Sequence, residues 1–260
     1  MTALLQHLEA VRSAGRKIFV PYLMAGIPDR ATFSDLLAAD QSDAIEVGLP
    51  FSDPLMDGPV IAEAGERAIA GGLGPLDAID LVAHAPAGPP KLVMTYYNPI
   101  HHLGEDEFCR RVAAAGVTGL IVPDLPLEES GSLRGHAAVH GLAWVPLVAP
   151  TSSPQRVKAI AATATGFVYA VSTLGVTGVR DTLSKRSSRV VEACRAVTGL
   201  PVLVGIGVST PDQAHEAAST ADGVVIGSAV VKRQVEEGRA AVEAFFTAVR
   251  TALSGGTGDR

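Results

Sequence analysis

Two carboxyl side chains close together in the chain are the first residues whose types and spacing could do chemistry. Glu46 stands between the apolar residues Ile45 and Val47 in a run that reads as a strand, and Asp57 follows in a loop rich in proline and glycine. Burial favours the neutral form of a carboxyl, which suits acid–base exchange near neutral pH. Together the two carboxyls indicate catalysis more strongly than either does alone; a hydrogen-bonded core glutamate and a turn aspartate are the ordinary alternatives.

Glycines near the carboxyl end of the chain have the composition of an anion site. Gly207 ends an apolar run just before a helix expected to begin at Pro211, and Gly227 and Ser228 end the next apolar run. Glycine lets backbone N–H groups approach an anion, and a helix N-terminus adds favourable partial charge. Two such places on successive runs predict a phosphate site. The alternative is that these glycines only make tight turns.

Other reactive groupings are missing from the sequence. The seven histidines, including the adjacent His101 and His102, show neither HxH nor HExxH spacing. There is no GxSxG nucleophile elbow and no P-loop, and the GxG ending at Gly207 is followed by Thr210 where a dinucleotide fingerprint needs glycine. We expect no metal site.

Eight short runs of apolar residues are the elements that must position these groups. They are nearly continuously apolar rather than alternating, which is typical of parallel strands covered by helices. Segments with helical periodicity lie between them, and glycine or proline marks most boundaries. The runs are 18–24, 44–49, 92–97, 119–124, 144–149, 167–172, 201–207 and 223–227.

The alternation of strands and helices predicts an α/β fold, a single (β/α)8 TIM barrel that occupies residues 1–260 as one domain. An open doubly wound sheet is the competing architecture. Leu4, Leu5, Leu8 and Val11 follow helical spacing and predict an N-terminal lid helix. The segment 254–260, rich in glycine, reads as a flexible tail. In such barrels function sits on the loops after the carboxyl ends of the strands.

Composition and charge argue against nucleic acid and membranes as partners and favour one cell compartment. The net charge is −6 and no Lys/Arg run is present, which argues against a nucleic-acid surface. No apolar stretch reaches the roughly 18 residues that span a bilayer, so we expect no membrane association. The lone cysteines Cys109 and Cys194, together with a first segment unlike a signal peptide, favour a cytoplasmic location.

The motifs together resemble the tryptophan synthase α-subunit family. The resemblance rests on IEVGLPFSDPLMDGP (45–59), VPDLPLEES (122–130), GVTG (175–178), GIGVSTPDQ (205–213) and IGSAVVK (226–232). The segments occur in family order and cover nearly the whole chain, and the first is the most specific of them. The resemblance implies retro-aldol cleavage of indole-3-glycerol phosphate to indole and glyceraldehyde 3-phosphate, a lyase step of L-tryptophan biosynthesis.

The resemblance also assigns roles to residues. It implies that Glu46 is the acid–base group and Asp57 the group that recognises indole. It places pocket-lining residues at Tyr22, Met94, Tyr96 and Tyr169, the loop threonine at Thr177, and phosphate-binding positions at Gly178, Gly207, Gly227 and Ser228. Three places depart from the family: Tyr22 stands where phenylalanine is common, Thr173 stands where the family often has a longer side chain, and the first loop reads MAGIPD (24–29) rather than TLGDP.

The family further implies a partner and its cofactor. The α chain works in an αββα heterotetramer with a β subunit, and pyridoxal phosphate is expected only in that β subunit. Three rival functions remain: another phosphate-binding barrel enzyme such as an isomerase, a non-catalytic regulatory subunit, and a free-standing lyase. Retention of both carboxyls disfavours the regulatory subunit, and the sequence does not separate the lyase that needs a partner from the free-standing one.

Overall fold

The computed structural model describes residues 1–171, 180–205 and 207–255, of which 180–187 by backbone alone. Parallel strands form one sheet in the order β5-β4-β3-β2-β1-β9-β8-β7-β6. These are β1 (Ile18–Met24), β2 (Ile45–Gly48), β3 (Lys91–Met94), β4 (Val117–Ile121), β5 (Ala143–Trp144), β6 (Leu147–Val148), β7 (Val168–Val171), β8 (Val202–Gly205) and β9 (Gly223–Ile226).

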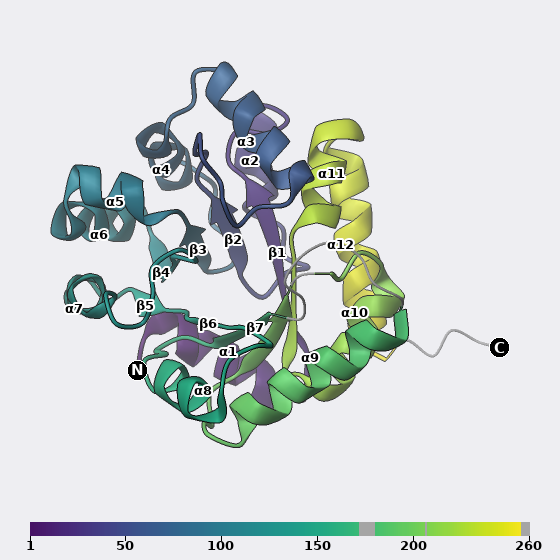
Figure 1. Cartoon of the computed structure of the whole chain (residues 1–260). Helices are drawn as coiled ribbons and strands as arrows, with labels where there is room; N and C mark the ends of the chain where they lie inside the picture. Colours follow the sequence, from purple (N-terminus) through teal and green to yellow (C-terminus); the bar gives the residue numbers. More distant parts are fainter. Residues whose placement is uncertain (172–179, 206, 256–260) are drawn as a thin grey trace.

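The two ends of this ladder, β5 and β6, are consecutive in the chain. Val145 donates to the Leu120 carbonyl on one side (3.0 Å), and Tyr169 donates to the Pro146 carbonyl on the other (3.1 Å). Proline has no N–H to give, which interrupts the strand pairing at Pro146 and divides the predicted run 144–149 in two. Residues 143–148 thus act as one barrel strand that is interrupted at Pro146. When β5 and β6 are counted together as this strand, the nine-stranded sheet closes into an eight-stranded barrel. Figure 1 shows its arrangement. The predicted barrel is confirmed, and the open sheet is excluded.

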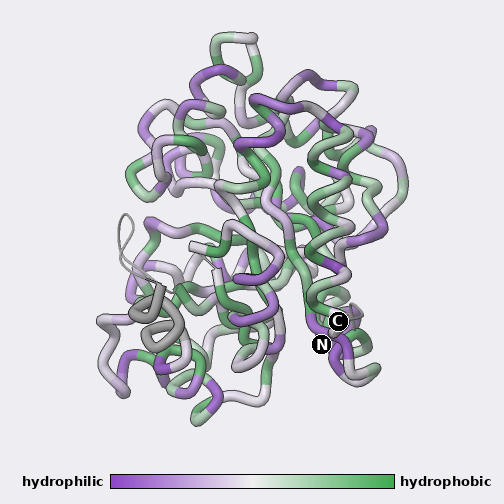
Figure 2. Tube along the Cα trace, turned by 90° about the vertical axis from the view of Figure 1, so that its right-hand side faces the viewer, coloured by the Kyte–Doolittle hydropathy of each residue, from purple (hydrophilic) through white to green (hydrophobic). Residues whose placement is uncertain are grey.

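Helices surround the barrel, and the strands at its centre are largely hydrophobic (Figure 2). They are α1 (Ala3–Ser13), α2 (Arg30–Leu36), α3 (Pro59–Ala70), α4 (Pro75–Ala83), α5 (Tyr97–Leu103), α6 (Glu105–Ala114), α7 (Gly131–Val139), α8 (Pro154–Ala161), α9 (Arg180–Arg195), α10 (Pro211–Thr220), α11 (Ser228–Glu236) and α12 (Arg239–Leu253). Apolar side chains on the outer side of the strands pack against these helices and form the main core. A second cluster fills the barrel itself.

Helix α1 has the predicted position of an N-terminal lid. Its buried residues Leu4, Leu8 and Val11 belong to the cluster inside the barrel. The Thr2 hydroxyl caps the helix by accepting from the Leu5 N–H (3.3 Å), and it donates to the Thr165 carbonyl (2.7 Å), just before β7. The amino-terminal end of the barrel is therefore closed, and the carboxyl-terminal end of the strands is left for a site.

Two further expectations concern the surface and the end of the chain. Within the described residues no helix is long and apolar enough to cross a membrane. Helix α12 ends at Leu253 with Ser254 as its C-cap. Residues 256–260 of the predicted tail lie outside the described part of the chain.

Candidate active site

Glu46 lies inside the barrel because strand alternation sends its neighbours Ile45 and Val47 to the outer core. It pairs in register with Tyr22 on β1 and with Leu92 on β3. Its side chain is 2% exposed, and its Oε2 is the buried side-chain oxygen that lacks a hydrogen-bond partner among the described residues. Burial, followed by the charge of Asp57, raises the pKa of Glu46 to about 8. The carboxyl is therefore mainly protonated at neutral pH.

Asp57 lies in the loop between β2 and α3, just before the helix begins. Burial raises its pKa to about 6, while a hydrogen bond with the Tyr96 side chain acts in the opposite direction. Tyr96 is itself held in place: its hydroxyl accepts from the Met56 N–H (3.0 Å), and its ring stacks on Phe51 with centroids 5.2 Å apart. At neutral pH Asp57 is mainly ionised. The two carboxyls thus have different protonation states, as an acid and a charge acceptor require.

Tyr22 is on β1, between the end of β2 and the end of β9. It is 4% exposed, and its hydroxyl oxygen lies 1.8 Å from the point where a Cβ on Gly48 would stand. Its own Cβ lies 3.8 Å from the corresponding point on Gly227, at the end of β9. Burial raises the pKa of Tyr22 well above its ordinary value, and the charges of Asp57 and Glu46 raise it further. The phenol is therefore a neutral group beside both carboxyls.

The other two predicted pocket residues also line the interior. Tyr169 on β7 is buried, and its hydroxyl oxygen lies 2.1 Å from the point of a Cβ on Gly205. Burial and then the charge of Glu46 raise its pKa well above the ordinary value. Met94 ends β3, pairs with Gly48, and packs half-buried against the cluster inside the barrel. Six predicted residues, from four strands and the segments that follow β2 and β3, thus surround the same space.

The predicted phosphate positions stand side by side at the ends of β8 and β9. Gly205 pairs with Val225, so Gly207 and Gly227 each lie two residues beyond paired positions. Gly207 has φ = 96°, a left-handed conformation that favours glycine. Helix α11 begins at Ser228, and in its described first turn there is neither a side-chain cap bond nor an acidic residue. Its N-terminus therefore keeps the partial positive charge that attracts an anion.

Helix α10 begins close to the same place. The Thr210 hydroxyl accepts from the Gln213 N–H (3.2 Å), and Pro211 takes the first helical position, as the sequence predicted. The remaining predicted site residues, Thr177 and Gly178, lie outside the described residues, as does Thr173. In the part of the chain that the structure describes, no group of three or more His, Cys, Asp or Glu is placed to hold a metal ion.

Four further residues shape the site; sequence reasoning gave no role to three of them, and it took Gly205 only as the first glycine of the predicted phosphate loop. Gly48 and Gly205 lack side chains and so leave room for the phenols of Tyr22 and Tyr169. The ring of Phe51 stacks on the ring of Tyr96. Gln234 on α11 is fully buried. Its Oε1 accepts from the Met24 N–H (3.0 Å), and its Nε2 donates to the Ile27 carbonyl (2.8 Å). A glutamine one helical turn after a buried valine in α11 was the available signal for this contact.

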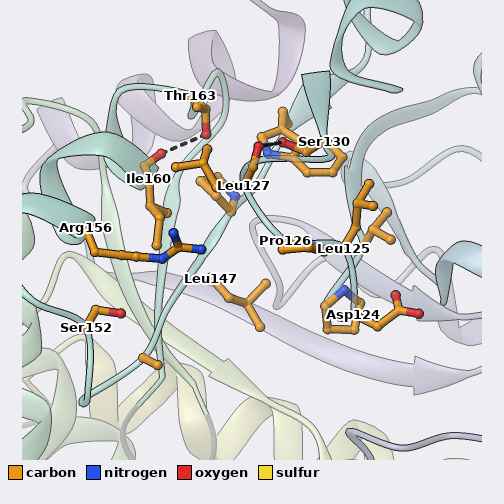
Figure 3. A pocket seen from close by; sticks show the side chains of 15 residues that line it. Asp124, Leu125, Pro126, Leu127, Ser130, Leu147, Ser152, Arg156, Ile160 and Thr163 are labelled. Atoms are coloured by element: carbon orange, nitrogen blue, oxygen red, sulfur yellow. Dashed lines mark hydrogen bonds between the residues drawn. The ribbon is translucent and has the colours of Figure 1, made fainter. Parts of the chain in front are cut away.

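A separate cavity lies between the loop after β4 and helix α8 (Figure 3). Its volume is about 390 Å³. Leu125, Leu127, Trp144 and Leu147 are among its apolar walls, and Arg156 lies at its edge. It is lined by most of the motif 122–130, and none of the predicted catalytic or phosphate-binding residues borders it.

A closed barrel with two carboxyls of raised pKa at the carboxyl-terminal end of its strands defines an acid–base enzyme of the (β/α)8 class. The family model described as "Tryptophan synthase alpha chain" matches residues 8–253. The chain therefore belongs to the tryptophan synthase alpha chain family, a family of lyases.

Individual relatives agree over nearly the full length of the chain. A tryptophan synthase alpha chain from Synechocystis sp. is 45% identical and covers 98% of this chain and 100% of its own. A structure of Mycobacterium tuberculosis tryptophan synthase superposes with a TM-score of 0.89 at 39% identity, over 97% of this chain and 98% of the other. A structure of the tryptophan synthase alpha chain from Legionella pneumophila superposes with a TM-score of 0.87 at 30% identity, over 100% of this chain and 100% of the other.

Proposed function

We propose that this chain cleaves indole-3-glycerol phosphate to indole and glyceraldehyde 3-phosphate as the α subunit of a tryptophan synthase. The observation that carries the proposal is Glu46: a buried carboxyl with an unpartnered oxygen and a pKa of about 8, beside a second carboxyl. A buried polar atom without a partner costs free energy, and substrate chemistry is a reason to retain it. Family membership supports the same reaction.

Glu46 moves the protons in the proposed reaction. Its protonated carboxyl gives a proton to C3 of the indole ring, which makes the ring an acceptor for the electrons of the C3–C3′ bond. The resulting Glu46 carboxylate then takes the proton of the C3′ hydroxyl, the aldehyde forms, and the C3–C3′ bond breaks. Glu46 ends protonated as it began, so the cycle balances. Placement of one group against both atoms is what such a step requires.

Asp57 stabilises the charge that develops on the indole ring. Protonation at C3 puts positive charge on the ring nitrogen, and an ionised carboxylate that accepts the ring N–H lowers the energy of that state. Its pKa of about 6 keeps Asp57 ionised at neutral pH, and Tyr96 holds it by a hydrogen bond. Tyr22, Met94 and Tyr169 form the walls against which the ring lies.

The phosphate of the substrate binds at Gly207, Gly227 and Ser228 in this proposal, with Gly178 and Thr177, which lie outside the described residues, as the further contacts that the family assigns. The N-terminus of α11 supports the assignment, since its first turn carries no acidic residue in the described structure. Tyr22 lies between this position and the carboxyls, so its ring would contact the substrate between phosphate and indole.

The loop after β2 supports a protein partner. Leu55 and Met56, immediately before Asp57, are 86% and 53% exposed. Large apolar side chains exposed together at the mouth of a site are typical of an interaction surface. We propose that a β subunit covers them in an αββα complex, that docking closes this loop on the substrate, and that pyridoxal phosphate belongs to the β subunit alone. The proposal also includes a single functional domain. It further includes a cytoplasmic location, which the two buried free cysteines support.

Indole release from indole-3-glycerol phosphate, with and without a cognate β subunit, tests the proposal. Glu46→Gln should lose at least about 1000-fold in kcat, because the proton carrier is removed, while substrate binding measured by calorimetry persists. Glu66→Gln, at an exposed position on α3, is the matched control and should keep full activity. Near-normal turnover by Glu46→Gln refutes the assignment. Fast release that the β subunit does not accelerate identifies a free-standing lyase instead.

A further inference from the structure

Three phenols surround the carboxyl pair, and each comes from a different part of the barrel. Tyr96 follows β3, and its hydroxyl bonds to the Met56 N–H and to the side chain of Asp57. Tyr169 lies on β7 with its hydroxyl over Gly205, and Glu46 is the carboxyl whose charge acts on it. Tyr96 therefore interacts with Asp57, and Tyr169 interacts with Glu46. The carboxyl that the Tyr22 hydroxyl faces follows from the geometry of β2.

The geometry of β2 places the Tyr22 hydroxyl towards Asp57. Tyr22 pairs in register with Glu46, but its oxygen reaches forward to Gly48, the last residue of β2. Gly48 pairs with Met94, two residues before Tyr96. The oxygen of Tyr22 thus stands at the level where the chain enters the loop of Asp57. Consistently, the charge of Asp57 raises the pKa of this phenol more than the charge of Glu46 does.

We propose that the Tyr22 hydroxyl donates a hydrogen bond to the Asp57 carboxylate in the substrate-filled site, directly or through one water, and so acts with Tyr96 to keep Asp57 ionised. This proposal rests on the proposed function and gives Tyr22 a positioning role beyond that of a pocket wall. Hydrogen bonds of catalytic groups are often long in ligand-free enzymes and tighten when substrate binds.

The direction of the effect follows from the donor. A hydrogen bond to a carboxylate favours its charged form and lowers its pKa. Loss of the Tyr22 hydroxyl therefore raises the pKa of Asp57, and activity that needs the ionised form falls away at a higher pH. Loss of a wall contact alone changes kcat/KM by the same factor at every pH.

The test is the pH dependence of kcat/KM in Tyr22→Phe, with the holoenzyme and indole-3-glycerol phosphate. The acid limb should move upward by about half a unit to one unit, so that kcat/KM falls about threefold to sevenfold more at pH 5.5 than at pH 8. Tyr96→Phe is the positive control and moves the same limb. Tyr169→Phe is the matched negative control and leaves the acid limb in place, because its charged neighbour is Glu46.

A second variant keeps the proposal falsifiable if Tyr22→Phe folds poorly. A fluorinated tyrosine incorporated at position 22 keeps the ring and is a stronger donor, so the acid limb should move to lower pH. An unchanged limb in both variants, with Glu46→Gln and Asp57→Asn inactive, overturns the role of the Tyr22 hydroxyl and leaves the lyase assignment standing. Full activity of Glu46→Gln overturns the proposed function itself.

Discussion

The hydroxyl oxygen of Tyr22 occupies the space that a side chain on Gly48 would need, because a Cβ on Gly48 would lie 1.8 Å from that oxygen. Tyr22 is on β1 and Gly48 is on β2, so the contact joins two neighbouring strands, two residues after Glu46. Real Cβ contacts are essentially never so short, and Tyr22 is almost fully buried. The position of the phenol therefore depends on the missing side chain of Gly48.

Gly48→Ala is expected to displace Tyr22 and damage the site. Overpacking of this kind costs about 1–3 kcal/mol of unfolding free energy, and a displaced pocket residue costs roughly 100-fold in kcat/KM. Urea unfolding and indole release measure the two effects. Gly135→Ala on α7 is the control, since a Cβ there meets nothing within 4 Å. It should keep activity and gain about 0.5–1 kcal/mol.

A double variant separates overpacking from other causes. Tyr22→Leu removes the clashing ring, so Gly48→Ala combined with Tyr22→Leu should recover part of the stability lost by Gly48→Ala alone. Activity stays low, because the phenol is missing. If Gly48→Ala behaves like the wild type, the contact between Tyr22 and Gly48 is not as described.

The two carboxyls predict a bell-shaped pH dependence of kcat/KM. Asp57 must be ionised and its pKa is about 6, whereas Glu46 must be protonated and its pKa is about 8. Activity should therefore rise through about pH 6 and fall through about pH 8. A stopped assay of indole release between pH 5 and 9.5 checks this. A flat profile over that range contradicts the assigned protonation states.

The same pKa shift of Glu46 makes a prediction about stability. Its pKa rises from 4.5 to about 8 on folding, so the folded protein binds more protons than the unfolded chain between these values. Stability that depends on Glu46 is then lost as pH rises from about 4.5 to 8. Glu46→Gln has no charge to bury, and it should exceed the wild type by about 2–4 kcal/mol at pH 8.5 and by little at pH 5.

Urea unfolding at both pH values measures this difference. Glu66→Gln, again at an exposed position on α3, should differ from the wild type by the same small amount at pH 5 and pH 8.5. A variant that is inactive and more stable at high pH identifies Glu46 as a residue kept for chemistry at the expense of the fold. Equal stability of the two proteins at pH 8.5 contradicts the raised pKa.

Much of the barrel follows from local sequence. The run 18–24 is β1 to the residue, and α10 begins at Pro211 as predicted, because strand hydrophobicity and helix starts are decided by neighbouring residues. The split of the run 144–149 at Pro146 is also a local effect, but its consequence is not. Closure of the ladder requires β5 and β6 to find partners on opposite sides, which no short segment specifies.

The candidate site was less accessible to sequence reasoning. Glu46 is conspicuous because a carboxyl in an apolar strand is costly, whereas Asp57 was a weaker candidate whose specific role, recognition of indole, came from the resemblance. Gly48 looked like an ordinary glycine and Gly205 like part of a phosphate loop, since the phenols that fill the space beside them come from residues far away in the chain. Contacts of this kind depend on strand register, and register is fixed only when the whole sheet forms.

Gln234 provides a last prediction, on the support of β1. Its buried amide accepts from the Met24 N–H and donates to the Met24 and Ile27 carbonyls at 3.3 and 2.8 Å. Gln234→Leu removes the partner of the Met24 N–H and of the Ile27 carbonyl, whereas the Met24 carbonyl still accepts from the Ile27 N–H, and this should cost about 2–4 kcal/mol of unfolding free energy. Gln6→Leu, exposed on α1, should change stability by less than about 0.5 kcal/mol.

The same variant should also affect catalysis, because Met24 follows Tyr22 by two residues on β1 and α11 begins at the predicted phosphate position. A shift of β1 against α11 moves the pocket wall relative to the phosphate, so KM should rise severalfold while the limbs of the pH profile stay in place, since neither carboxyl is touched. Steady-state kinetics at several pH values test this. An unchanged KM in a folded Gln234→Leu protein shows that the amide serves stability alone.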